Sequence, residues 1–102
     1  MKEEAINFEE NVGKDVALKG KISEEIWQHM LEYVESHPYE NYFNLSDRNI
    51  QIVVYAKKKI DCEDEIIIKG KLIQLRGNKH PRSKVNESYI EYHLIADSWK
   101  CL

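Results

Sequence analysis

Apolar and polar residues alternate along several short segments of the chain, and this pattern predicts a mainly β protein. In residues 14–22, Val16 and Leu18 fall on one face and Lys19 and Lys21 on the other. A period of two residues is typical of a strand that buries one of its faces. Four further segments have strand character, namely residues 42–45, 50–55, 66–75 and 89–99. The sequence therefore predicts five strands, and the polar turn between the second and the third predicts a hairpin.

The segment between the first and second predicted strands has helical spacing instead. Ser23 is a suitable N-cap, and the two acidic residues that follow it suit the first turn of a helix. An apolar stripe follows at helical spacing, formed by Ile26, Trp27, Met30, Leu31 and Val34. The helix is expected to end by His37, because the residue before Pro38 avoids helical angles. We predict an amphipathic helix at residues 24–36, with its apolar stripe covering the strands rather than binding a partner.

A Lys-Gly-Lys sequence occurs twice, at residues 19–21 and 69–71, each time in the middle of a predicted strand. Glycine is disfavoured inside strands, because it packs no side chain and loses much backbone entropy on folding. It is found where a strand bends sharply or bulges. Two such strands in one small domain predict a closed barrel.

Composition limits the size and class of the protein. The 102 residues are enough for one domain with a modest core. We assign this domain to residues 12–102, after an acidic arm at residues 1–11. With 42% hydrophobic and 32% charged residues, the composition is that of a soluble globular protein. The apolar runs are much too short to span a bilayer and the N-terminus lacks an apolar signal segment, so we expect a cytoplasmic protein with no membrane partner.

Charge is distributed unevenly, although the formal net charge is only −3. Residues 23–40 carry five glutamates and no lysine or arginine, which makes the predicted helix acidic. Residues 76–86 carry four basic residues and no acid, in a segment without periodicity that we predict to be a loop. A solvated loop and a phosphate-binding loop both fit this basic run.

The predicted elements together resemble the OB-fold, a five-stranded Greek-key barrel with long connections after its first and fourth strands. The stretch from Tyr42 to Leu75 is similar to the core of single-stranded nucleic-acid-binding domains of the replication protein A and anticodon-binding kind. This resemblance implies that the first strand pairs with both the second and the fourth. It also implies a non-catalytic module that binds single-stranded DNA or RNA.

OB-folds hold single strands across the outer face of their second and third strands, with aromatic rings stacking on bases and basic residues contacting phosphates. Strand parity places four candidates on that face, namely Tyr42, Asn44, Gln51 and Tyr55. The tyrosines would stack on bases and the amides would bond base edges. The expected phosphate contacts are Lys19 and Lys21 on the first strand and Arg76, Lys79, His80, Arg82 and Lys84 after the fourth. The alternative for the tyrosines is that they only stabilise the sheet across strands.

Catalysis and cofactor binding have little support in the sequence. It contains no glycine-rich phosphate loop, metal-ligand motif or nucleophile motif, so we predict neither an enzyme nor a cofactor. Cys62 and Cys101 are too few for a disulfide scaffold or a complete zinc site, and we expect free thiols. Because the third and fifth strands of an OB-fold run parallel, a disulfide or a shared metal at one pole of the barrel is the alternative.

A second function also fits the sequence. In it the barrel is a structural or protein–protein interaction module, and the acidic helix at residues 24–36 forms the contact with a protein partner through Trp27 and Tyr33. An oligosaccharide or another small ligand is a third possibility for this fold.

Overall fold

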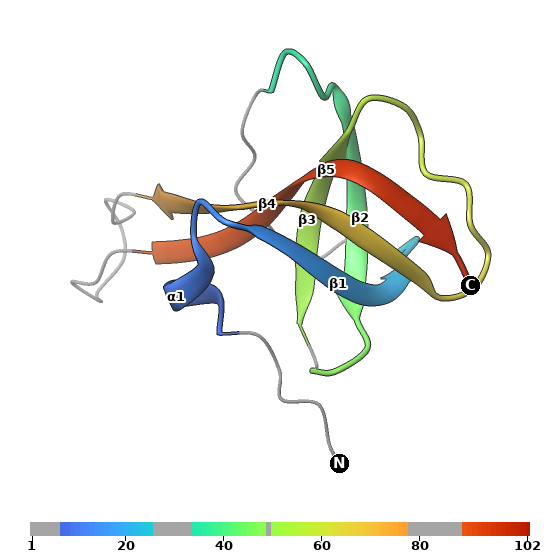
Figure 1. Ribbon diagram of the computed structural model, residues 1–102, viewed down its shortest axis with the longest axis horizontal. Helices are drawn as coiled ribbons and strands as arrows, with labels where there is room; N and C mark the ends of the chain where they lie inside the picture. Colours follow the sequence, from blue (N-terminus) through green and yellow to red (C-terminus); the bar gives the residue numbers. More distant parts are fainter. Residues whose placement is uncertain (1–6, 26–33, 49, 78–88) are drawn as a thin grey trace.

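Five strands form a closed barrel in the computed structural model, which describes residues 7–25, 34–48, 50–77 and 89–102 (Figure 1). The strands are β1 (Asp15–Ile22), β2 (Tyr39–Leu45), β3 (Gln51–Ala56), β4 (Ile66–Gly77) and β5 (Tyr89–Cys101). A short helix, α1 (Phe8–Asn11), precedes β1. The prediction of a mainly β protein with five strands is confirmed. No helix among the described residues combines the length and the apolar character needed to cross a membrane.

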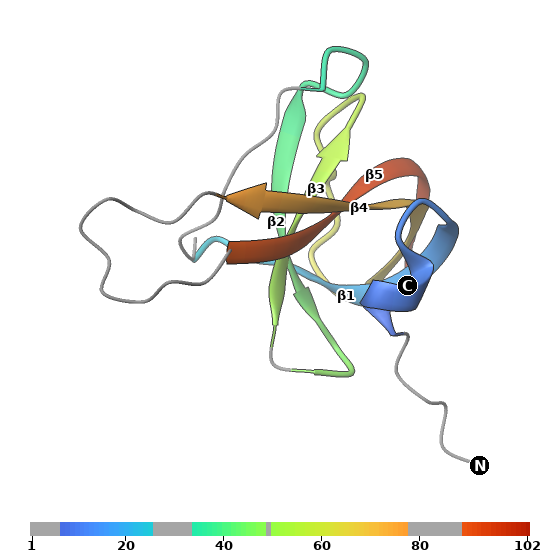
Figure 2. The ribbon, with the colours of Figure 1, turned by 90° about the vertical axis from the view of Figure 1, so that its left-hand side faces the viewer.

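The strand order is β1-β2-β3-β5-β4, and β4 returns to β1 to close the barrel. β1 pairs antiparallel with both β2 and β4, while β3 and β5 are parallel. In both ribbon views the β2–β3 hairpin runs across β4 and β5 (Figure 2). This is the arrangement expected of an OB-fold barrel.

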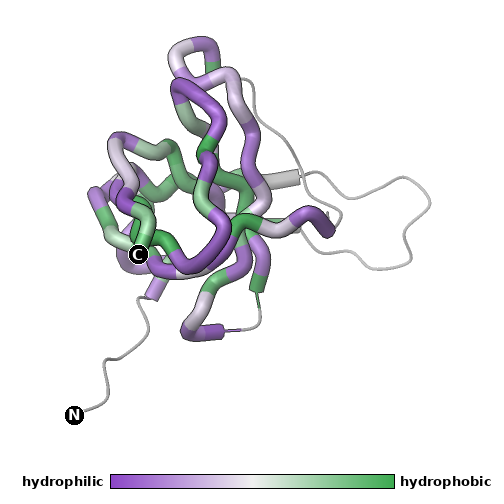
Figure 3. The backbone as a smooth tube through the Cα atoms, turned by 90° about the vertical axis from the view of Figure 1, so that its right-hand side faces the viewer, coloured by the Kyte–Doolittle hydropathy of each residue, from purple (hydrophilic) through white to green (hydrophobic). Residues whose placement is uncertain are grey.

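Side chains of alternating positions fill the barrel. On β1 the burial pattern switches at every residue, so the predicted parity of this strand is confirmed. Hydrophobic and hydrophilic residues alternate along the backbone (Figure 3). Fully buried core residues come from all of the later strands, among them Phe43, Val54, Ile68, Leu72 and Leu94.

Helix α1 adds a core residue that the sequence analysis did not assign. Phe8 is 8% exposed and belongs to the core cluster. Its ring lies 5.5 Å from the ring of Tyr92. The guanidinium carbon of Arg48, beyond β2, lies 4.4 Å from the centre of the same ring. An aromatic pair and a cation–π contact therefore hold α1 against the barrel.

Gly20 and Gly70, the centres of the two Lys-Gly-Lys sequences, lie where strands approach too closely for any side chain. A Cβ atom at Gly20 would overlap the carbonyl oxygen of Asn44, and one at Gly70 would overlap that of Ile95. The β4–β5 register also shifts by one residue between Lys69 and Gly70, which is a β-bulge. The closed barrel and the bulge agree with what the glycines predicted, and the close approaches of the strands at both glycines are a further finding.

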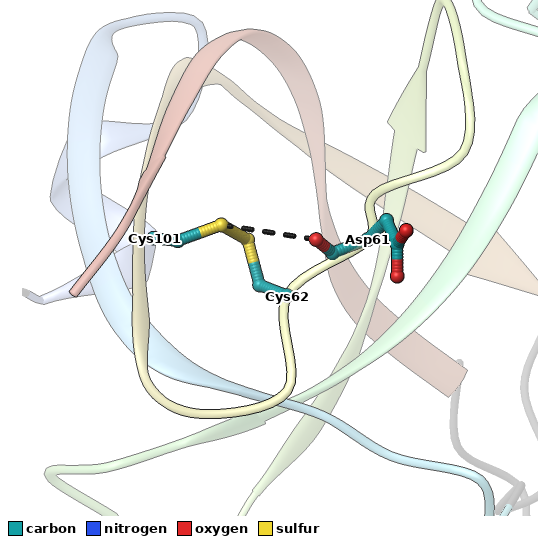
Figure 4. Close-up of a disulfide and its surroundings, with 3 residues drawn as sticks. All are labelled: Asp61, Cys62 and Cys101. Atoms are coloured by element: carbon teal, nitrogen blue, oxygen red, sulfur yellow. Dashed lines mark hydrogen bonds between the residues drawn. A yellow bond between two sulfur atoms is a disulfide. The ribbon is translucent and has the colours of Figure 1, made fainter.

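A disulfide joins the two cysteines, Cys62 and Cys101, whose Cα atoms are 5.6 Å apart (Figure 4). Cys62 lies in the connection from β3 to β4, and Cys101 is the last residue of β5. Because β5 runs parallel to β3, it ends near the connection that leaves β3. The expectation of free thiols is wrong, and the alternative of a disulfide is confirmed.

Two predicted segments lie largely outside the described residues. They are the amphipathic helix at residues 24–36 and the basic loop at residues 76–88. The loop prediction is wrong at its start, because Arg76 and Gly77 continue β4 and pair with Ile90 and Tyr89 of β5. The β4–β5 ladder therefore extends two residues farther than the turn-forming composition of this segment indicated.

Candidate functional site

The outer face of β2 and β3 is the surface where the sequence analysis placed a nucleic-acid site, but β3 is not open to solvent. All six residues of β3 are buried. Gln51 is 4% exposed, Val53 0% and Tyr55 1%. Parity placed these three side chains correctly on the side opposite the core, yet the expectation that Gln51 and Tyr55 are accessible is wrong. Neither residue can stack on or bond to a base in this conformation.

Tyr55 is held in a buried polar chain between β3 and β5. Its hydroxyl lies 2.8 Å from Nδ1 of His93, and Nε2 of His93 lies 3.1 Å from Oε1 of Glu91. His93 is completely buried, and the Glu91 side chain is 12% exposed. Buried polar groups need such partners, because an unpaired one costs the desolvation of the group. The alternative reading of Tyr55, stabilisation of the sheet, therefore fits its contacts. No local pattern in the sequence indicates this role of His93, because its partner Tyr55 is 38 residues away in the chain.

Gln51 is held in a second buried contact. Its side-chain nitrogen donates hydrogen bonds to Oδ1 of Asn44, at 2.9 Å, and to the backbone oxygen of Glu25, at 2.8 Å. An amide NH₂ group has two hydrogens, so these two bonds use both. Gln51 thus fixes the orientation of Asn44 and ties the segment after β1 to β3, and it has no hydrogen left to donate to a ligand.

Part of the predicted site remains accessible on the outer surface of the paired strands β1 and β2. Asn44 and Lys21 are both exposed, and they lie directly opposite each other in the β1–β2 register. Tyr42, the next outward residue along β2, is half-buried. Lys19 is exposed on β1, two residues before Lys21. We call these four residues the β1–β2 edge.

Lys19 forms an ion pair at the border of this edge. Its Nζ lies 3.8 Å from Oε2 of Glu65, and the two side chains are 53% and 39% exposed. The same carboxylate oxygen accepts a hydrogen bond from the hydroxyl of Ser46 at 2.8 Å. Exposed ion pairs contribute little to stability and are screened by salt. A phosphate could therefore replace Glu65 as the partner of Lys19 at small cost.

The remaining predicted residues cannot be placed in the site. Arg76 is a residue of β4. The other four, Lys79, His80, Arg82 and Lys84, lie outside the described residues, so their role stays a prediction.

The structure also gathers residues that the sequence analysis did not connect. A hollow of about 270 Å³ lies on the β4–β5 hairpin, lined by Ile67, Lys69, Ser98, Trp99 and Lys100. The antiparallel register pairs Lys69 with Ser98 and Ile67 with Lys100. Alternation along each strand was visible in the sequence, but the bulge that sets this register was not.

Among the described residues, no group of three or more histidine, cysteine or acidic side chains is arranged to hold a metal ion. Comparison of the chain with protein-family models, curated proteins and solved structures finds no match.

Proposed function

We propose that the barrel binds single-stranded nucleic acid without catalysing a reaction, and that the nucleic acid contacts the β1–β2 edge. The observation that carries this proposal is the exposed pair Lys21 and Asn44, which are register partners on adjacent strands. An ammonium group suits a phosphate, and an amide suits a base edge. Gln51 holds the Asn44 side chain in place through its 2.9 Å hydrogen bond, so less side-chain entropy is lost on binding.

Tyr42 supplies the stacking surface, because Tyr55 is buried. Stacking on an aromatic ring contributes roughly 1–3 kcal/mol per base. One such platform with a few lysine contacts supports a weak affinity, and the basic residues Arg76, Lys79, His80, Arg82 and Lys84 would add to it. The net charge of −3 opposes binding to a polyanion, so the complex should form best at low salt.

The test is a fluorescence anisotropy titration with labelled DNA and RNA of mixed sequence, about 12 nucleotides long, at low salt. We expect saturable binding that weakens with salt, and Lys21→Ala should reduce the slope of log affinity against log salt by about one. Asn44→Ala should weaken binding with the salt slope unchanged, because an amide contact releases no counterion.

Lys58→Ala is the matched control, since Lys58 is an exposed lysine in the connection after β3. It removes the same charge away from the edge and should leave the affinity unchanged. Absence of binding at about 100 μM protein would overturn the proposal and favour the protein-interaction alternative. Equal losses in Lys21→Ala and Lys58→Ala would show that general charge, and not the β1–β2 edge, attracts the strand.

A further inference from the structure

Lys69 and Lys100 are brought together on the outer face of the β4–β5 hairpin. Lys69 lies opposite Ser98 in the register, and Lys100 is two residues beyond Ser98, so the two lysines are diagonal neighbours on one face. Diagonal positions of an antiparallel pair are roughly 7–8 Å apart, within reach of long side chains. Both lysines and Ser98 line the hollow of about 270 Å³.

These two ammonium groups form no ion pair with an acidic side chain among the described residues, unlike Lys19 on the neighbouring strand β1. Lys19 is paired with Glu65, whereas Lys71 lies opposite Asp15 in the β1–β4 register and forms no ion pair with it in the described structure. Asp97, the carboxylate next to Ser98 along β5, forms no ion pair with Lys69 or Lys100 in the described structure. Like charges at neighbouring positions of a sheet repel each other. An anion between Lys69 and Lys100 would remove this repulsion.

The chemistry of the lining is that of a site for a small oxyanion. Each ammonium group has three hydrogens to donate, and the Ser98 hydroxyl has one. Ile67 and Trp99 supply the apolar part of the wall, and hydrogen bonds from the two ammonium groups to a phosphate are charge-assisted, which makes them stronger than neutral ones. The volume of about 270 Å³ is just below the range of about 300–1,000 Å³ typical of small-molecule pockets.

We propose that this hollow is a phosphate-binding site formed by Lys69, Ser98 and Lys100. The phosphate is a free anion, such as pyrophosphate or a nucleotide, or a group of a nucleic-acid backbone. The free-anion source is independent of the proposed function. The backbone source rests on the proposed function. Lys19 of β1, Ile67 of β4 and Lys100 of β5 are successive register partners, so a bound nucleic acid would extend along this row from Lys19 to Lys100.

The test is a titration of the ¹⁵N-labelled protein, followed by amide chemical shifts, with inorganic pyrophosphate in one arm and a 12-nucleotide oligonucleotide in the other, a length within the roughly 4–16 nucleotides that one OB fold binds. We expect pyrophosphate to shift the amides of Ile67, Lys69, Ser98 and Lys100. Lys69→Gln and Lys100→Gln should each weaken this binding by about five-fold. Lys71→Gln is the control for the same charge change on the same strand, and it should leave the affinity within about two-fold.

The two arms separate the sources of the phosphate. If the nucleic-acid backbone is the source, the oligonucleotide shifts the amide signals of both the hollow and the β1–β2 edge, and Lys100→Gln weakens that complex. If a free anion is the source, pyrophosphate shifts the amide signals of the hollow and the oligonucleotide does not. Pyrophosphate binding without any oligonucleotide binding would refute the proposed function and support this site.

Two outcomes would overturn the site. One is that neither ligand shifts the hairpin amides. The other is that Lys71→Gln weakens binding as much as Lys69→Gln, since general charge would then explain the attraction. Because all of these lysines are exposed, an unchanged amide spectrum before ligand is added verifies that each variant is folded.

Discussion

The hydroxyl of Tyr55 lies 2.8 Å from Nδ1 of His93, and both side chains are buried although they stand on the outer side of the barrel. The two residues belong to β3 and β5, which are far apart in the chain but are parallel neighbours in the barrel. Tyr55, which the sequence predicted to stack on a base, therefore makes a structural contact instead. This contact also shifts the candidate interface from β3 to the β1–β2 edge.

Replacing Tyr55 by phenylalanine is expected to destabilise the fold. The variant keeps the ring but removes a hydroxyl that partners a buried nitrogen of His93, and such a loss costs about 1–3 kcal/mol. Guanidinium unfolding measures the change in the free energy of unfolding. Tyr39→Phe is the control, because Tyr39 is 50% exposed, and it should change stability by less than about 0.5 kcal/mol. Unchanged stability in Tyr55→Phe, together with weaker oligonucleotide binding, would restore Tyr55 as a platform.

Gly70→Ala is expected to be among the most damaging small substitutions in the chain. Its Cβ would meet backbone atoms of Ile95 and Ala96, which no rotamer change can move away. Overpacking against backbone should cost about 3 kcal/mol or more. At Gly13 a Cβ would meet nothing within 4 Å, but the residue has φ +83°, so Gly13→Ala should cost only about 1–2 kcal/mol. Thermal or denaturant unfolding of both variants checks the order, and equal losses would contradict the steric explanation.

The barrel could be predicted from the sequence because its signals are local. Parity along β1 and the glycines at residues 20 and 70 depend on each strand by itself, and both predictions agree with the structure. Long-range information was missing where the site prediction failed. Parity tells which side of β3 Tyr55 occupies, but whether that side is open depends on neighbours such as His93, which is 38 residues away in the chain.

The pairing of Lys69 with Ser98 could not be predicted from the sequence for a similar reason. The bulge between Lys69 and Gly70 shifts the register by one residue, and no local pattern specifies its position on the partner strand. The disulfide was an alternative rather than the first expectation, because two cysteines alone do not indicate proximity. Only the parallel course of β3 and β5 brings Cys62 and Cys101 within reach of each other.

Removing the disulfide is expected to destabilise the barrel. The cysteines are 39 residues apart in the chain, and a cross-link of that span typically contributes about 2–4 kcal/mol by restricting the unfolded state. The double variant Cys62→Ser/Cys101→Ser should therefore unfold at lower denaturant than the oxidised wild type. Sγ of Cys101 lies 3.8 Å from the backbone oxygen of Asp61 (Figure 4). A sulfur in a disulfide has no hydrogen to donate, so this contact can be a hydrogen bond only in the reduced wild type, where a weak S–H donor does not offset the loss of the cross-link.

Dithiothreitol provides the control for that comparison. It should lower the stability of the wild type to that of the double variant and leave the double variant unchanged. Disulfides persist mainly in oxidising compartments, whereas the sequence predicts a cytoplasmic protein. Measuring the thiol content of the wild type at a cytosolic glutathione poise shows which form is populated there. Equal stability of the oxidised and reduced wild type would contradict a structural role for the bond.

Glu65→Gln is expected to strengthen oligonucleotide binding at the β1–β2 edge. The substitution keeps a side-chain oxygen that can accept the hydrogen bond from Ser46, but it removes the charge that lies 3.8 Å from Nζ of Lys19. Lys19 then has no carboxylate competing with a phosphate, and the repulsion between Glu65 and the strand disappears. Anisotropy at low salt should show a gain of about two- to five-fold, which shrinks as salt screens the charges. Glu63→Gln, at an exposed position in the same connection, makes the same change in net charge. If Glu63→Gln produced an equal gain, the effect would come from net charge, and the proposed contact of Lys19 with the strand would be wrong.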